Sequence, residues 1–230
     1  MAKKSASAIA HVFKMIKDNN VKMVDLKFVD LLGVWQHVTV PVYRLEESSF
    51  EDGFGFDGSS VRGFKAINES DMLMVPDPQT AFIDPFVQVA TISFICEIFD
   101  PLTKERFSRC ARGIAHKAEQ YMMSTGIADV AYMGAEAEFF IFDDIRFDTN
   151  GNSSYYYVDS IEGRWNSGRD EMPNLGYKPR YKEGYYPAPP IDHLMDLRNE
   201  MVANMIAAGG RDTAPRGRQR RASGDRFEVC

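Results

Sequence analysis

The sequence predicts an α+β protein, because one amphipathic helix is followed by several segments with strand periodicity. Apolar residues recur at helical spacing from about Ser5 to Asp18. Alternating apolar and polar residues then cover Val21–Val29 and Val34–Val42, with a turn signal near Leu32-Gly33 between them. The chain is therefore expected to begin with a helix and a β-hairpin.

The first unit continues through a loop and two further strands. Residues Glu46–Ser60 are rich in acid, glycine and serine, which predicts an ordered functional loop without regular structure. Met72–Val75 and Val87–Phe99 are predicted strands, and Asp100-Pro101 ends the second one. We therefore place a first α+β domain over residues 1–102.

A helix predicted over Lys104–Met123 begins a second unit, placed over residues 103–210. The next segment, Gly134–Phe142, predicts a buried strand because it is apolar and aromatic apart from two glutamates. Residues 144–190 are aromatic and rich in glycine and proline, which predicts a long functional loop. Asp192 is the predicted N-cap of a last helix that ends at Gly209-Gly210.

The two glutamates of the buried strand are the first candidate site. Glu136 and Glu138 share one face of a strand, about 7 Å apart, because side chains alternate. Burying two unpaired carboxylates costs several kcal/mol each, so a compensating cation is expected, and hard divalent ions such as Mg²⁺ or Mn²⁺ fit. The alternative is a strand whose solvated face carries two glutamates without a ligand.

Composition excludes several partner classes. The formal net charge of -6 and the pI near 5.3 argue against nucleic-acid and anionic-membrane partners, which select basic surfaces. No segment is long and apolar enough to cross a bilayer, and no secretory signal is visible. The three cysteines lack metal-type spacing, which suits a reducing compartment. We expect a cytoplasmic protein.

Four motifs, in this order, resemble type I glutamine synthetase. They are Phe56-Asp57-Gly58-Ser59-Ser60, Ile67-Asn68-Glu69-Ser70-Asp71-Met72, Gly134-Ala135-Glu136-Ala137-Glu138-Phe139-Phe140, and Gly184-Tyr185-Tyr186-Pro187-Ala188-Pro189-Pro190-Ile191-Asp192. The resemblance runs almost continuously from Val12 to Gly210. It implies an N-terminal β-grasp domain followed by the start of a catalytic domain whose curved antiparallel sheet holds divalent metals.

The resemblance also implies an activity and an assembly. In that family ATP phosphorylates the side chain of glutamate, ammonia displaces the phosphate to give glutamine, and Mg²⁺ or Mn²⁺ assists. Intact members form two stacked six-membered rings with each active site between adjacent subunits. Glutamate, ammonia, ATP and further copies of the chain are therefore the expected partners.

The motif match assigns roles to individual residues. Glu136 and Glu138 are similar to metal ligands of the family. Asp57 matches an aspartate that a neighbouring subunit donates to the ammonium pocket, where a carboxylate holds NH₄⁺ and helps remove its proton. For an isolated Asp-Gly the alternative is an Asx-turn that only stabilises the loop. Asp71 resembles a second acid at the same boundary, and it could equally be structural.

Two aromatic residues are assigned to the nucleotide and substrate entrance by the same resemblance. Tyr185 resembles an aromatic side chain of the family at this place, and its alternative is packing beneath Pro187. Phe64 stands where some relatives have tryptophan, which implies stacking across the subunit contact.

The resemblance stops after Gly210. Residues 211–230 contain six arginines against three acids, a formal charge of +3. Suitable codons for Asp212 to Val229, read one nucleotide later, can spell Thr-Gln-His-His-Glu-Val-Ala-Asn-Gly-Gly-Gln-Ala-Glu-Ile-Asp-Leu-Lys-Phe, which is similar to the family at this point. We expect a frameshift near Gly210, and a solvated basic tail is the alternative.

Three functions follow from these expectations. The first is a glutamate–ammonia ligase of which this chain holds an N-terminal part that lacks turnover alone, because roughly half of the catalytic domain is missing. The second is a non-catalytic fragment that enters rings of intact subunits. The third is a related ligase that joins glutamate to a larger amine.

Overall fold

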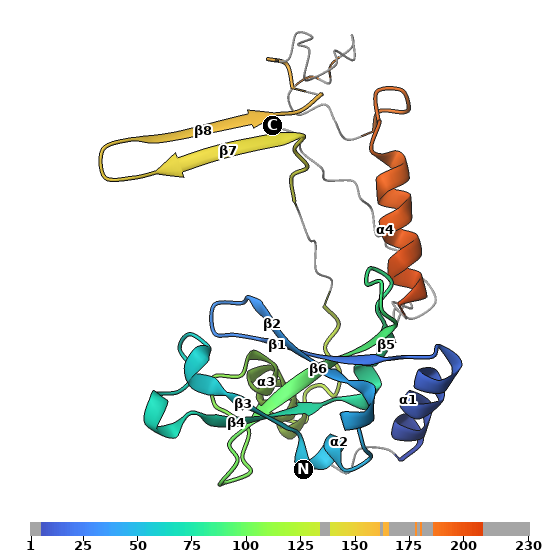
Figure 1. Cartoon of the computed structure of the whole chain (residues 1–230), viewed down its shortest axis with the longest axis vertical. Coiled ribbons are helices and arrows are strands. Elements are labelled where there is room, and N and C mark those ends of the chain that lie inside the picture. The colour runs from blue at the N-terminus through green and yellow to red at the C-terminus, as the bar shows by residue number, and fades with distance from the viewer. Residues whose placement is uncertain are drawn as a thin grey trace. The chain divides into compact units, whose positions relative to one another are not determined.

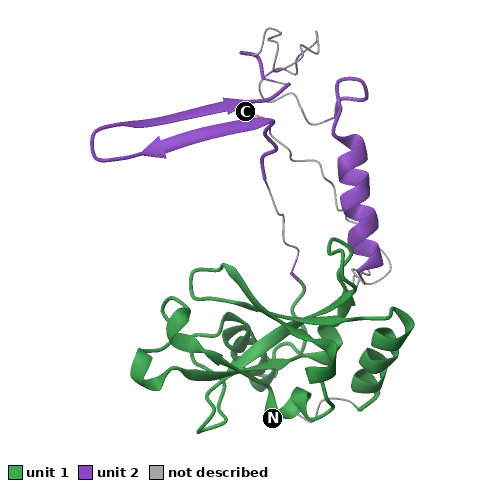
Figure 2. Cartoon of the chain, in the orientation of Figure 1, with its two compact units in different colours: residues 1–132 green, residues 133–230 purple. Residues whose placement is uncertain are grey.

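The computed structural model describes residues 6–133, 139–161, 163–165, 178, 180 and 186–208. The chain divides into two compact units, residues 1–132 and 133–230, which Figure 2 shows in different colours. Among the described residues, none of the helices has the length and apolar character needed to cross a membrane.

The first unit is built on a mixed sheet whose strands run in the order β2-β1-β6-β4-β3, with β5 paired to β6 (Figure 1). The strands are β1 Met23–Val29, β2 Trp35–Pro41, β3 Phe54–Asp57, β4 Asp71–Pro76, β5 Phe82–Ile83 and β6 Thr91–Phe99. β1 runs parallel to β6, and every other described pairing in this unit is antiparallel. The predicted α+β class and the β1–β2 hairpin are confirmed.

Helices and short turns complete the first unit. They are α1 Ala6–Asp18, α2 Ser49–Asp52, α3 Ala111–Ser124, η1 Val42–Arg44, η2 Gly58–Ser60, η3 Ile67–Glu69 and η4 Pro78–Thr80. One face of the sheet is apolar: Leu26, Phe94 and Met74 from three neighbouring strands are fully buried, together with Val12 of α1. Burial of such side chains contributes about 1.5–3 kcal/mol each, so this face holds the unit together.

The opposite face of β6 carries polar residues. Glu97 is buried there, with its carboxylate 3.8 Å from Arg112 Nε and 2.8 Å from His116 Nε2 of α3. Side chains alternate along a strand, so Glu97 and the core residue Phe94 lie on opposite faces. A charge cluster therefore holds α3 against the sheet.

Three predictions for the first unit are wrong in part. Residues Glu46–Ser60 form α2, β3 and η2 in place of an irregular loop, and the strand predicted from Val87 begins at Thr91. The helix predicted from Lys104 begins at Ala111. The reason is that the preceding segment pairs with β6: the Phe107 amide donates to the Ile98 carbonyl at 2.8 Å, and the Phe107 ring is buried.

The described part of the second unit contains a β-hairpin and one helix. β7 Asp144–Thr149 and β8 Ser154–Asp159 pair antiparallel, and α4 spans Met195–Ala207. The long loop predicted over residues 144–190 is therefore wrong at its start. Asp192 is not the N-cap, which is Leu194, although the Asp192 carboxylate accepts from the Leu194 amide at 3.3 Å.

The buried strand predicted over Gly134–Phe142 is wrong for its described residues, Phe139–Phe142. Phe139 and Phe140 lie outside any strand and are 40% and 53% exposed. A strand needs a neighbour for its backbone hydrogen bonds, and the two described strands of this unit, β7 and β8, pair only with each other. Residues 134–138 lie outside the described residues.

Candidate functional site

Two of the predicted site residues lie opposite each other at the end of the β3–β4 pair. Asp57 is the last residue of β3, Asp71 is the first of β4, and their Cα atoms are register partners. Both side chains are exposed. The segment between them, residues 57–70, is called the Asp57 loop below. Its ends are joined by the Gly58 amide, which donates to the Ser70 carbonyl at 2.6 Å.

The Asp57 carboxylate organises the start of its own loop. Its Oδ1 accepts from the Ser59 amide at 2.8 Å and from the Ser59 hydroxyl at 2.6 Å, and its Oδ2 accepts from the Ser60 hydroxyl at 2.7 Å. These bonds form the Asx-turn that Asp-Gly-Ser-Ser favours. They hold the pKa of Asp57 below its usual 3.8, the Ser59 hydroxyl being the largest cause. The side chain is therefore ionised at neutral pH.

Hydrogen bonding leaves this carboxylate able to bind a cation. The carboxylate is exposed and ionised, although Ser59 and Ser60 already donate to both of its oxygens. Asp71 stands directly across the strand pair, and like charges in such a position repel. A cation close to both groups would relieve that repulsion.

Packing beneath the loop explains why glycine follows Asp57. Gly58 is buried, and a Cβ at this position would lie 2.4 Å from the Met72 sulfur and 3.1 Å from the Ser70 carbonyl oxygen. The Met72 side chain is itself buried in the core. Glycine has no side chain, so the loop can lie close to the sheet here and its first turn is fixed in position.

The structure places Phe64 in the core of the first unit. Its side chain is 1% exposed, and its ring lies 5.0 Å from that of Phe107 and 5.9 Å from that of Phe28, measured between centroids. These contacts fix the far part of the Asp57 loop. The entrance role assigned to Phe64 stays a prediction.

Glu136, Glu138 and Tyr185 lie outside the described residues. Among the residues that are described, no group of three or more His, Cys, Asp or Glu side chains is arranged to hold a metal ion. The metal assignment of Glu136 and Glu138 therefore stays a prediction from sequence.

A known fold matches this chain. The cryo-EM structure of a Plasmodium falciparum glutamine synthetase superposes with a TM-score of 0.74, covering 90% of this chain and 41% of that one. The identity is 20%, so the likeness concerns the fold. The described strands and helices therefore share the fold of that protein's matching part.

Family models then give the family. The model described as the β-grasp domain of glutamine synthetase matches residues 20–101, and the catalytic-domain model of the same family matches residues 108–214. The chain belongs to the glutamine synthetase family, and the predicted fold is confirmed.

Curated relatives agree in sequence. Glutamine synthetases of Microchaete diplosiphon, Nostoc sp. and Aquifex aeolicus are 59%, 55% and 54% identical over 86% of this chain. The chain spans 42% of the length of each.

Proposed function

We propose that this chain carries the N-terminal part of a ligase that joins ammonia to glutamate at the expense of ATP. The observation that supports this most directly is the ionised, exposed Asp57 carboxylate opposite Asp71, in a chain that matches both glutamine synthetase domain models in order. Ammonia is almost entirely NH₄⁺ at neutral pH, so a site that uses it must hold a cation and remove a proton.

Asp57 has the properties that this task requires. Its low pKa keeps it charged, and its exposed carboxylate can approach an ammonium ion while Asp71 adds negative charge nearby. Ammonium has no lone pair, so one proton must pass to the bound carboxylate before the nitrogen can attack. Glu136 and Glu138 would hold Mg²⁺ or Mn²⁺, which neutralises phosphate charge during phosphoryl transfer when bound. The chain would contribute its Asp57 to the site of an adjacent subunit.

Turnover by this chain alone is not expected. Phosphoryl and amide transfer depend on positioning by several elements, and the chain spans 42% of its relatives. An assay with glutamate, ATP and ammonia should therefore yield no glutamine from the purified chain. Glutamine formed at a rate proportional to its concentration would contradict this part of the proposal.

Complementation tests the contribution of Asp57 itself. The intact glutamine synthetase of Microchaete diplosiphon would be prepared with alanine in place of its aspartate aligned with Asp57, which should lower its activity at least about 100-fold. Assembly with the present chain should restore measurable turnover, because the chain brings an intact Asp57 loop. The Asp57→Asn form of the chain is the matched control and should restore none. Equal rescue by both forms would refute the role of Asp57.

A non-catalytic subunit is the second candidate. The first unit closes a complete apolar core from its own residues, so it is able to occupy a place in a ring without completing a site. Co-assembly with the relative without any gain in turnover would favour this function.

We also propose that residues 211–230 are translated out of frame. With suitable codons, a one-nucleotide shift can turn eighteen consecutive positions, Asp212 to Val229, into a sequence similar to the family. Sequencing the coding DNA tests this, and codons that do not spell that peptide in the shifted frame would exclude it.

A further inference from the structure

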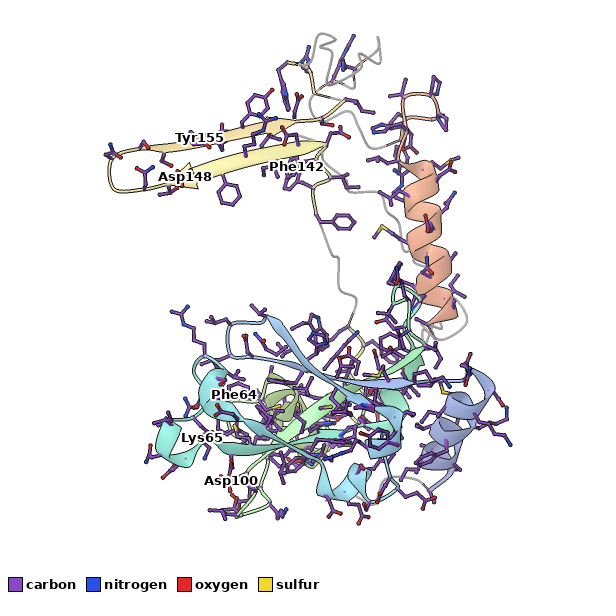
Figure 3. All side chains as sticks on the ribbon, in the orientation of Figure 1. Phe64, Lys65, Asp100, Phe142, Asp148 and Tyr155 are labelled. Carbon is purple, nitrogen blue, oxygen red and sulfur yellow. The ribbon has the colours of Figure 1, made fainter. Side chains whose placement is uncertain are left out.

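The returning part of the Asp57 loop is fixed to a segment that belongs to neither β3 nor β4. This segment, residues 100–110, connects β6 to α3 and is called the 100–110 connector. Gly63, Phe64 and Lys65 each contact it. Figure 3 labels Phe64, Lys65 and Asp100 on the same end of the first unit.

An ion pair forms the centre of this contact. Lys65 Nζ donates to Asp100 Oδ2 at 3.1 Å, and the two side chains are only 19% and 24% exposed. Asp100 is itself fixed, because its Oδ1 accepts from the Leu102 and Thr103 amides at 2.9 and 3.0 Å. The Thr103 amide, followed by the Lys65 ammonium, lowers the pKa of Asp100 to about 2. The carboxylate is therefore charged and rigidly held at any physiological pH.

A second cation reinforces the pair. Arg109 Nη1 donates to the Gly63 carbonyl, and its guanidinium lies 5.3 Å from the centroid of the Phe107 ring. Lys65 Nζ lies 6.0 Å from the same ring, which also packs against Phe64. Cations near an aromatic ring are attracted to its face. Phe107 therefore joins the two cations and the loop in one packed group.

Backbone hydrogen bonds connect this group to Asp57. The Lys65 and Val61 amides both donate to the Gly58 carbonyl, at 3.4 and 3.3 Å, and Gly58 directly follows Asp57. A shift of Lys65 would therefore move the Gly58–Ser59 peptide unit, whose amide donates to Asp57 Oδ1. The 100–110 connector and the Asp57 carboxylate are linked through a single chain of contacts.

We propose that Lys65, Asp100 and Arg109 are positioning residues that hold the Asp57 carboxylate in the one orientation suited to ammonium. The catalytic meaning of that orientation rests on the proposed function. Exposed ion pairs are usually worth little, but this one is about four-fifths buried and shares Phe107 with a second cation. None of the three residues needs to touch the substrate. They act through Gly58 and the loop backbone.

Hydrogen exchange of the 230-residue chain tests the structural part of the proposal. Lys65→Met should accelerate exchange of the loop amides between Gly58 and Lys65 about tenfold, while amides of α1 and β1 keep their rates. Lys65→Arg should restore protection, because arginine supplies the same charge. Lys14→Met is the matched control, since it removes the exposed Lys14–Asp18 pair of α1. Unchanged loop exchange in Lys65→Met, or equal acceleration over the whole unit, would overturn the proposal.

Kinetics test the positioning role separately. In the complementation assay, the Lys65→Met chain should raise the KM for ammonium at least about fivefold and leave the KM for ATP within about twofold of that with the unaltered chain. Lys65→Arg should return the ammonium KM toward its original value. An unchanged ammonium KM would overturn the positioning role. If even the unaltered chain restores no turnover, the proposed function fails, and hydrogen exchange alone decides whether these residues hold the loop.

Discussion

Replacing Glu97 with glutamine should weaken the attachment of α3 to the sheet. The Glu97 side chain is 10% exposed. Its carboxylate accepts from Arg106 Nε at 2.8 Å, pairs with His116 Nε2 at 2.8 Å, and lies 3.8 Å from Arg112 Nε. Glutamine keeps the shape and one acceptor oxygen, but it leaves three cationic or ionisable partners beside a neutral group.

The expected loss follows from how far the partners are buried. Breaking a fully buried pair by removing one partner costs about 3–5 kcal/mol, whereas an exposed pair contributes 0–1 kcal/mol. Glu97 is buried, while Arg106, Arg112 and His116 are between a quarter and a third exposed. The loss in the free energy of unfolding of the first unit should therefore be about 2 kcal/mol.

The pKa of Glu97 determines how the stabilisation by its carboxylate changes with pH. Burial alone would raise the pKa of Glu97, but the hydrogen bond from Arg106 and the nearby cations outweigh it and hold the pKa below the usual 4.5. The folded state therefore releases this proton more readily than the unfolded state. The stabilisation is present above pH 4.5 and is lost as the pH falls below that value. The difference in the free energy of unfolding between the Glu97→Gln protein and the unaltered protein should therefore shrink at low pH.

Urea unfolding monitored by circular dichroism at pH 7 and at about pH 3 measures the loss of unfolding free energy and its decrease at low pH. Glu119→Gln is the matched control, because Glu119 lies in the same helix and contacts His116 from an exposed position. A Glu97→Gln protein within about 0.5 kcal/mol of the unaltered one at pH 7, or a loss that does not diminish at low pH, would refute the reasoning.

Three further predictions concern the sheet and the Asp57 loop. Gly53→Ala should cost about 3 kcal/mol or more in urea unfolding, because φ is +74° and the new Cβ would lie 2.8 Å from the Met74 carbonyl oxygen. Phe94→Ala, at a fully buried position, should cost about 3–5 kcal/mol in the same measurement. Asp57→Asn should abolish the pH dependence of the protection factor at the Ser59 amide, which in the unaltered chain should fall below about pH 3.8.

Periodicity predicted the parts of the fold that depend on local pattern. The opening helix and the first hairpin were located to within about two residues, because their apolar residues recur at helical and at strand spacing. The start of α3 was missed because Phe107 has helical spacing but packs as part of a segment paired with β6. Sequence spacing cannot distinguish an apolar residue of a helix from one that precedes it.

The candidate site was predicted only where its chemistry is local. The turn formed by Asp57 follows from Asp-Gly-Ser-Ser. Its pairing with Asp71 was not predicted, because β3 lies in a segment expected to be an irregular loop. Lys65 and Asp100 were missed because they are 35 positions apart and their contact depends on the fold. A signal was present at Asp100, since Asp-Pro-Leu-Thr favours the Asx-turn that fixes its carboxylate.

The two interpretations of Asp57 that the sequence left open are compatible in the structure. A carboxylate used only for a turn has no need to remain exposed, and one used only to bind a cation has no need for three internal hydrogen bonds. Ser59 and Ser60 favour the ionised form and fix its direction before any ligand arrives. Binding then requires little reorganisation of the side chain. A flexible acid would lose affinity because it would have to be ordered on binding. If Asp57 binds ammonium as we propose, this turn holds its carboxylate ready for the ligand.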